Sequence, residues 1–401
     1  MTRINDYKQI VGAGAIDDLK RAAEPLIGKH IVHINSTHNG GGVAEMLNSL
    51  LPLFNDLGVS SGWRVLKGNR DFFTITKSLH NALQGAKIQF SDHEKRMYEQ
   101  VNRVYATYTH IDRHDCVVIH DPQPLALIGS YRKTQPWIWR CHIDISRPDH
   151  KAWQYLSRFA KRYDRIIVSS ESFRRDLGIP HEVVAPSIDP LSEKNRMMST
   201  REVNRELKKF GIPQDKPIIS QVSRFDRWKD PLGVIAAFRI VREKHDCRLV
   251  LLGSSASDDP EGISLYEQVL DAARGDPDIH VINFESDLLV NALQRASSVV
   301  VQKSLREGFG LTVSEALWKG TPVVAGDAGG IGLQIAHGRT GYLITTTEEC
   351  ADSILRLLTR PAVAKRMGER GYEHVKRNFL ITRHLKEYLH VFKNTVINYT
   401  P

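Results

Sequence analysis

The sequence predicts an α/β protein made of two doubly wound, Rossmann-like parallel sheets. Short runs rich in Val and Ile recur along the chain without alternating with polar residues, which is typical of strands buried on both faces of a parallel sheet. Amphipathic helical patterns lie between these runs, and alternation of strand and helix indicates an open α/β fold. The series occurs twice within 401 residues, a length that accommodates two domains.

Seven apolar runs predict strands, and each is followed by a polar or glycine-bearing turn. The predicted strands are 31–35, 116–120, 166–169, 218–222, 249–253, 299–301 and 322–325. Three helices between them have clear ends, as capping preferences require. The helix at 43–57 stops at Gly58, that at 231–243 has proline in its first turn, and that at 312–319 stops at Gly320.

A linker is predicted at 186–217, because this region contains proline, is highly charged and has few strand-forming residues. One short helix is expected within it, at 201–210, and two more follow the last strand, at 362–378 and 382–394. The predicted domains are 1–205 and 206–382. We expect them to face each other across a deep cleft, because paired open sheets usually bind ligands where their strand ends meet.

Composition and charge exclude several classes of protein. The net charge is +9, but Lys and Arg are dispersed along the chain, so we expect no nucleic-acid partner and at most a cationic pocket for a small anion. No apolar stretch reaches the roughly 18–20 residues that span a bilayer, so no membrane partner is expected. The N-terminus lacks a secretory signal, and the four cysteines form no CxxC pair. We therefore expect a cytoplasmic protein without a metal site.

A glycine-rich loop follows the first predicted strand and leads directly into a helix. Its sequence at 38–43 is His-Asn-Gly-Gly-Gly-Val. Glycines let the backbone approach a ligand closely, and the helix N-terminus offers N–H groups to an anion or a sugar oxygen. The loop does not match GxGxxG, so a dinucleotide site is disfavoured. Gly41 and Gly42 are the candidate binding residues, and a tight turn without a ligand is the alternative.

Two cations follow the strand at 218–222. Arg224 and Lys229 lie five positions apart around a turn, just before the helix that starts at Pro231, so both can reach one point above the sheet. Two fixed cations suit a diphosphate whose negative charge grows as it departs. The alternative is an exposed basic loop with ordinary surface ion pairs.

The strongest motif follows the strand at 299–301. Glu307 lies in a glycine-rich loop and Glu315 on the helix after it, separated by seven residues. Gly308 and Gly310 free backbone N–H groups to meet a phosphate, while the two carboxylates accept hydrogen bonds from hydroxyl groups. The motif predicts recognition of a sugar and a ribose, and the alternative is a helix cap with a buried salt bridge.

Charged side chains also follow two strands of the first half. Asp121 follows the strand at 116–120, and His142 and Asp144 follow an aromatic-rich strand that ends near Arg140. A lone histidine is more often a core residue than a catalyst, and that alternative stays open. The shared position at strand ends favours a functional site.

These motifs resemble those of the family-4 retaining glycosyltransferases, which have the two-domain GT-B architecture. Glu307 and Glu315 match the E-x7-E motif of that family, and Arg224 and Lys229 match its diphosphate clamp. More narrowly, the chain resembles the trehalose glycosyltransferring synthases and the related trehalose phosphorylases. The stretches that carry this resemblance are 39–46, 72–85, 118–124, 139–144, 186–195, 221–226, 258–262 and 306–320.

The resemblance implies a role for each charged candidate. Arg224 and Lys229 would hold the donor diphosphate and stabilise the leaving nucleoside diphosphate. Glu315 would bind the ribose hydroxyls, and Glu307 the 3- and 4-hydroxyls of the donor glucose. His142 would contact the donor sugar near the anomeric carbon, and Asp121 would bind the acceptor glucose.

The resemblance also implies backbone contacts and a domain crossing. Gly41 and Gly42 would approach donor and acceptor. The backbone amides that would meet phosphate and sugar belong to Gly308, Phe309, Gly310, Leu311 and Thr312. A C-terminal helix within 383–401 would join the first domain, and a homodimer is expected.

The implied reaction joins NDP-α-glucose (ADP-, UDP- or GDP-glucose) and glucose to give α,α-trehalose and NDP, reversibly and with retention. The leaving diphosphate would take the acceptor proton, so neither metal nor cofactor is required, and the DxD-like pair Asp276 and Asp278 is expected to be a loop. The partners are then small-molecule substrates. Three alternatives remain, namely a trehalose phosphorylase using phosphate or glucose 1-phosphate, a glycosyltransferase with another acceptor, and a non-catalytic nucleotide-sugar sensor.

Overall fold

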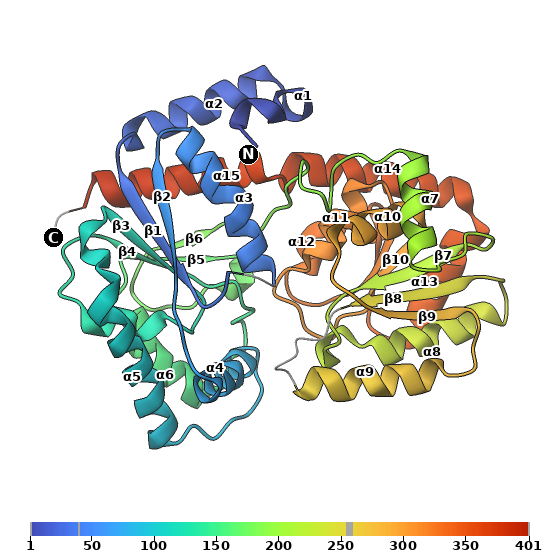
Figure 1. Ribbon diagram of the computed structural model, residues 1–401, viewed down its shortest axis with the longest axis horizontal. Helices are drawn as coiled ribbons and strands as arrows, with labels where there is room; N and C mark the ends of the chain where they lie inside the picture. Colours follow the sequence, from blue (N-terminus) through green and yellow to red (C-terminus); the bar gives the residue numbers. More distant parts are fainter. Residues whose placement is uncertain (1, 39–40, 254–259, 400–401) are drawn as a thin grey trace. The chain divides into compact units, whose positions relative to one another are not determined.

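The computed structural model describes residues 2–38, 41–253 and 260–399 (Figure 1). Residues 39–40 of the glycine-rich loop and 258–259 of the resembling stretch at 258–262 lie outside the described residues. The chain forms two compact units, Met1–Ser187 with Ile381–Pro401, and Ile188–Leu380. The domains drawn from the sequence, 1–205 with 383–401 and 206–382, stay a prediction, as does the cleft between them.

The first unit is built on a six-stranded parallel sheet in the order β2-β1-β3-β4-β5-β6. Its strands are β1 (His30–Asn35), β2 (Ser60–Val65), β3 (Cys116–His120), β4 (Trp137–Arg140), β5 (Arg165–Val168) and β6 (His181–Val183). The strand order changes direction between β1 and β3, because β2 lies on one side of this pair and the later strands on the other. Open α/β sheets bind ligands beyond the strand C-termini at such a point.

Helices cover both faces of this sheet. The helices are α1 (Lys8–Val11), α2 (Ala13–Ala23), α3 (Gly42–Asp56), α4 (Arg70–Leu83), α5 (Asp92–Thr109), α6 (His150–Ala160) and α15 (Ile381–Phe392). Figure 1 shows α4, α5 and α6 on one side, where their apolar faces pack on Val32, Val117 and Trp139. The C-terminal helix α15 packs against α2 and α3 on the other side.

The second unit repeats this architecture. Its parallel sheet has the order β12-β11-β10-β7-β8-β9, so the direction changes between β7 and β10. Its strands are β7 (Ile218–Val222), β8 (Arg248–Gly253), β9 (Ile279–Asn283), β10 (Ser297–Gln302), β11 (Val323–Gly326) and β12 (Tyr342–Ile344). Its helices are α7 (Thr200–Lys209), α8 (Pro231–Arg242), α9 (Pro260–Ala273), α10 (Asp287–Ala296), α11 (Leu311–Trp318), α12 (Ile331–Gln334), α13 (Thr347–Thr359) and α14 (Pro361–Asn378).

Two apolar layers hold the second unit together. Phe238 of α8 and Ile354 of α13 pack with Leu249 on one face of the sheet. Leu207 of α7 and Leu293 of α10 pack on the opposite face. The predicted fold class of two doubly wound parallel sheets is confirmed, and each of the seven predicted strands coincides with one of the strands above to within two residues. Within the described ranges, every helix is too short or too polar to cross a membrane.

Candidate active site

Lys229 and Glu307 meet at the point where the second sheet changes direction. Lys229 follows β7 and Glu307 follows β10, which are neighbouring strands. Their side chains form an ion pair in which the lysine is 18% and the glutamate 11% exposed. The Ser304 hydroxyl also donates to Glu307 Oε2, at 3.3 Å. Two of the predicted site residues, 78 positions apart, are therefore brought into direct contact.

Arg224 has a different environment from Lys229. Its guanidinium is 61% exposed, and its nearest ionic partner is Asp226, with Nη2 and Oδ2 3.8 Å apart. An exposed arginine with one loose ion pair is available to an incoming anion. The two predicted clamp residues thus differ, because the Lys229 side chain is mostly buried and ion-paired, whereas the Arg224 side chain is mostly exposed.

The glycine-rich loop ends at the start of α11, where Gly310 is the N-terminal cap. Its φ is +82°, and a Cβ on this residue would lie 3.2 Å from Glu307 Cγ. Glycine is therefore required here both by the left-handed backbone and by the close approach of Glu307. The Thr312 hydroxyl, on the first turn of α11, donates to the Val222 carbonyl at 3.2 Å. This bond ties the helix start to the end of β7.

Glu315 lies deeper, on the buried side of α11. Its side chain is 4% exposed, and Lys194 Nζ lies 4.0 Å from Oε1. Gln294 Nε2 donates to Oε2 at 3.4 Å. Glu315 therefore has polar partners within the unit, while Glu307 lies closer to the surface of the loop.

Asp121 and His142 lie together at the C-terminal edge of the first sheet. The His142 backbone N–H donates to Asp121 Oδ1 at 2.8 Å, and Asp121 adopts a left-handed conformation with φ +62°. Burial raises the pKa of Asp121 to about 6, although the His142 hydrogen bond and the Arg140 cation act to lower it. Burial also lowers the pKa of His142 well below 6.5, in the same direction as Arg140. In this pair, burial favours the neutral form of both the Asp121 carboxyl group and the His142 imidazole.

Gly41 and Gly42 lie at the N-terminus of α3, after β1. Gly41 has φ +81° and caps the helix without a side chain. The first N–H groups of α3 therefore lie near the point where the order of the first sheet changes direction. The predicted residues fall into two groups, with Gly41, Gly42, Asp121 and His142 in the first unit and the others in the second.

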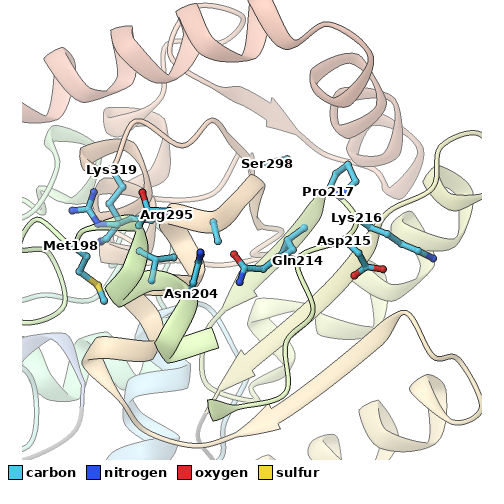
Figure 2. A pocket seen from close by; sticks show the side chains of 13 residues that line it. Met198, Asn204, Gln214, Asp215, Lys216, Pro217, Arg295, Ser298 and Lys319 are labelled. Atoms are coloured by element: carbon cyan, nitrogen blue, oxygen red, sulfur yellow. The ribbon is translucent and has the colours of Figure 1, made fainter. Parts of the chain in front are cut away.

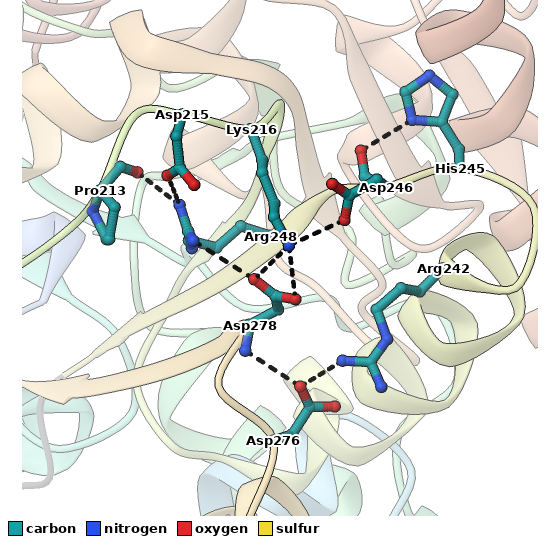
Figure 3. Close-up of polar contacts among 9 residues, drawn as sticks. All are labelled: Pro213, Asp215, Lys216, Arg242, His245, Asp246, Arg248, Asp276 and Asp278. Atoms are coloured by element: carbon teal, nitrogen blue, oxygen red, sulfur yellow. Dashed lines mark hydrogen bonds and ion pairs between the residues drawn. The ribbon is translucent and has the colours of Figure 1, made fainter.

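The DxD-like pair is engaged in ion pairs at the opposite edge of the second sheet. Asp276 pairs with Arg242, and Asp278 with Lys216 and Arg248 (Figure 3). These contacts use the carboxylates that a metal ion would need. Among the described residues, no cluster of three or more His, Cys, Asp or Glu side chains is arranged to hold a metal ion.

A pocket of about 620 Å³ also lies at that opposite edge (Figure 2). Its lining includes Pro217 and Ile218 at the start of β7 and Ser298 near the start of β10. Arg295 lines it too, but its guanidinium donates to Asn291 Oδ1 at 2.9 Å and to the Arg196 carbonyl at 3.0 Å. None of the predicted site residues is among its described lining.

Gln334 is a supporting residue that the sequence reasoning missed. Its side chain is fully buried, and its amide donates to the carbonyls of Phe309 and Gly310 while accepting from the Ser314 hydroxyl. It thereby holds the loop that carries the candidate phosphate amides. In the sequence, Gln334 is marked only by its position, three residues after the segment 325–331, which contains three glycines and follows the predicted strand at 322–325.

Comparison with known proteins identifies the family. Residues 33–175 match the family model "Trehalose synthase, N-terminal domain", and residues 202–374 match "Glycosyl transferases group 1". The chain is 45% identical over 394 residues to the trehalose synthase of Thermococcus litoralis, covering 96% of each chain. It is 29% identical over 433 residues to the trehalose phosphorylase of Pleurotus pulmonarius, covering 93% of this chain and 58% of that protein.

A solved structure agrees with the fold. The UDP-forming α,α-trehalose-phosphate synthase from Burkholderia vietnamiensis superimposes with a TM-score of 0.75 at 14% identity, covering 93% of this chain and 100% of that one. At this identity the likeness supports the fold alone. With both family models matched and a full-length relative at 45% identity, the chain belongs to the trehalose synthase family of GT-B glycosyltransferases, enzymes that transfer glycosyl groups in trehalose-related chemistry.

Proposed function

We propose that this enzyme transfers glucose from a nucleoside diphosphate glucose to free glucose, giving α,α-trehalose and NDP with retention of the anomeric configuration. The observation that carries the proposal is the Lys229–Glu307 ion pair. It places a cation that can bind the diphosphate next to a carboxylate that can bind the sugar, at the point where the strand order of the second sheet changes direction. The capped glycine loop beside it supplies backbone N–H groups for phosphate.

The chemistry follows from the charges around the donor. The bond between C1 of glucose and the diphosphate oxygen breaks, and Arg224 and Lys229 stabilise the negative charge that develops on the leaving group. C1 then bonds to the anomeric oxygen of the acceptor glucose, whose proton moves to the departing phosphate oxygen. Glu307 orients the donor hydroxyls, Glu315 the ribose, His142 the donor near C1, and Asp121 the acceptor. The atoms balance without a metal or a cofactor.

A trehalose phosphorylase is the second candidate, favoured by the similarity to the Pleurotus pulmonarius enzyme. In that reaction inorganic phosphate replaces the nucleotide, and the same cations would bind it. Glu315 would then have no ribose to bind. If the enzyme is a synthase, Glu315→Gln should therefore raise the KM for its NDP-glucose. If it is a phosphorylase, the same variant should leave the KM for glucose 1-phosphate unchanged.

The test is a matrix of ADP-, UDP- and GDP-glucose and glucose 1-phosphate, each supplied with free glucose. Trehalose and released nucleotide are measured by chromatography. Trehalose from an NDP-glucose supports the synthase and identifies its donor, whereas trehalose only from glucose 1-phosphate supports the phosphorylase. Donor hydrolysis without trehalose would overturn the assigned acceptor. Adding trehalose and NDP tests reversibility, and the expected homodimer is tested by light scattering.

A further inference from the structure

Three histidines of the first unit form a hydrogen-bonded row across its sheet. His33 lies on β1, His120 ends β3, and His142 follows β4. His33 Nδ1 lies 3.0 Å from His120 Nε2, and His120 Nδ1 lies 3.0 Å from His142 Nε2. At both steps the rings stack with centroids 5.3 Å apart. The row therefore connects the core beneath α3 and α15 to a residue of the candidate site.

The environment of the row favours the neutral form of all three imidazoles. Burial lowers the pKa of His33 to about 3. Burial likewise lowers the pKa values of His120 and His142 well below 6.5, and the Arg140 cation acts in the same direction on both. A neutral imidazole has one N–H and one bare nitrogen. Each contact in the row must therefore join one donor to one acceptor.

This requirement couples the three tautomers. If His33 carries its proton on Nδ1, His120 must accept at Nε2 and carry its own proton on Nδ1. His142 must then do the same. In the opposite arrangement all three protons lie on Nε2. Any mixed state would bring two N–H groups or two lone pairs together at 3.0 Å.

The inner end of the row decides between the two arrangements. His33 Nε2 is buried and has no hydrogen-bond partner in the described part of the chain. Its ring is surrounded by Phe54, Tyr388 and Phe392, with ring centroids 6.0–6.5 Å away. The Tyr388 hydroxyl is also buried without a partner there, so a proton on His33 Nε2 would add a second orphan donor. A bare nitrogen at that position is less costly.

We infer that the row holds His142 in the Nδ1–H tautomer, so that His142 presents a neutral N–H donor to an oxygen of the sugar substrate. His33 and His120 are positioning residues that act through His142. His142 is only partly buried, and among the described residues its Nδ1 has no hydrogen-bond partner. The identity of the acceptor oxygen rests on the proposed function, whereas the tautomer does not.

The row orients a donor and does not conduct protons. A proton path needs an outlet, and His33 Nε2 ends among aromatic rings. A neutral donor also suits a sugar hydroxyl, which can accept through a lone pair while donating its own proton elsewhere.

The test is ¹⁵N NMR of the full-length protein labelled at histidine, without substrate, at neutral pH. Two-bond correlations between ring nitrogens and carbon-bound protons distinguish a protonated Nδ1 from a protonated Nε2. The His142 signals are identified as those lost in His142→Gln. His280 lies in the second unit, outside the row. Its signals should therefore not change in variants of the row, and they serve as an internal control. We expect protonated Nδ1 on His33, His120 and His142 of the wild-type protein, and protonated Nε2 on wild-type His142 would overturn the inference.

Two variants of His33 test the coupling. His33→Asn keeps an amide donor close to the Nδ1 position, whereas His33→Phe keeps a ring without a donor. We expect His142 to remain a single Nδ1–H tautomer in His33→Asn and to become a mixture in His33→Phe. An unchanged His142 tautomer in a folded His33→Phe would overturn the positioning role. Loss of one neutral hydrogen bond should also lower kcat of His33→Phe roughly 2- to 12-fold, with rescue in His33→Asn. Absence of trehalose synthesis in wild type would refute the proposed function and leave the NMR result intact.

Discussion

At the scale of single residues, Lys229 and Arg224 share a proposed role but differ in burial. Truncating Lys229 leaves Glu307, 11% exposed, without its cation. Lys229→Ala is therefore expected to lower the free energy of unfolding by about 1–3 kcal/mol. Arg224 is 61% exposed, so Arg224→Ala should leave stability unchanged.

Each variant should lower kcat roughly 10- to 150-fold, because each removes a charged hydrogen bond to the leaving group. Denaturant unfolding and initial rates measure both effects, and wild-type rates in both variants would refute the clamp.

Gly310 is expected to tolerate no side chain. Gly310→Ala places a Cβ 3.2 Å from Glu307 Cγ at a φ of +82°. The left-handed backbone alone costs about 1–2 kcal/mol for alanine. Gly338 has φ +71° and no atom within 4 Å of an added Cβ, so Gly338→Ala isolates that backbone cost. Only Gly310→Ala should also lose activity, since only it displaces Glu307. Equal activities would show that Glu307 adjusts freely.

Asp121 should make stability depend on pH. Its pKa is about 6 in the folded protein, raised from 3.8 by burial, so the folded state holds a proton that the unfolded state has released. The stabilisation is present below about 3.8 and is lost as pH rises through about 6. Asp121→Asn keeps an oxygen for the His142 N–H and tolerates the positive φ but does not titrate. Between pH 4 and pH 7 the wild type should lose more free energy of unfolding than Asp121→Asn, and parallel pH profiles would contradict this.

At the scale of elements, β8 begins with a charged residue at the edge opposite the candidate site. Arg248 is 7% exposed and pairs with Asp215 and Asp278 (Figure 3). Arg248→Met removes the cation and leaves Asp278 with Lys216 alone. The variant should lose about 1–3 kcal/mol of stability and keep its wild-type kcat below its melting temperature. If Arg248→Met had the stability of the wild type but a lowered kcat, this edge of the sheet would be coupled to the candidate site.

Sequence reasoning succeeded for elements whose pattern is local. The core strands β1, β3, β7 and β8 are predictable because they are buried runs of apolar residues. The edge strand β2 was missed, since Ser60–Val65 is partly exposed and contains serine, glycine and arginine. That Lys229 and Glu307 lie at the same edge of the second sheet could be anticipated, because each follows a predicted strand, but their ion pair was not predicted. The bracing by Gln334 and the pairing of His33 with His120 could not, because each joins residues that only tertiary packing brings together.

At the scale of the whole molecule, the first unit is completed by the last helix of the chain. Six apolar residues of α15 are buried in it, namely Ile381, Leu385, Tyr388, Leu389, Val391 and Phe392. Burial of side chains of this size contributes about 1.5–3 kcal/mol each, a sum comparable to the stability of a domain. A chain ending at residue 380 should therefore lose hydrogen-exchange protection in β1 and α3 but keep it in β7 and α8. A chain ending at residue 397 is the control, and protected β1 in the shorter chain would contradict the expectation.

The polypeptide passes between the units twice, at Ser187–Ile188 and at Leu380–Ile381. In the first unit Ser187 Oγ lies 2.8 Å from His384 Nδ1, and in the second the Ile188 N–H donates to the Phe379 carbonyl at 2.9 Å. A break in the chain at the first passage yields a fragment of residues 1–187 that lacks one helix of its own fold. The other fragment carries that helix as an appendage. When the two fragments are synthesised separately, α15 of the second fragment can bind the first fragment at the position that it occupies in the intact chain. The fold is therefore suited to a split protein whose two parts assemble through the C-terminal helix.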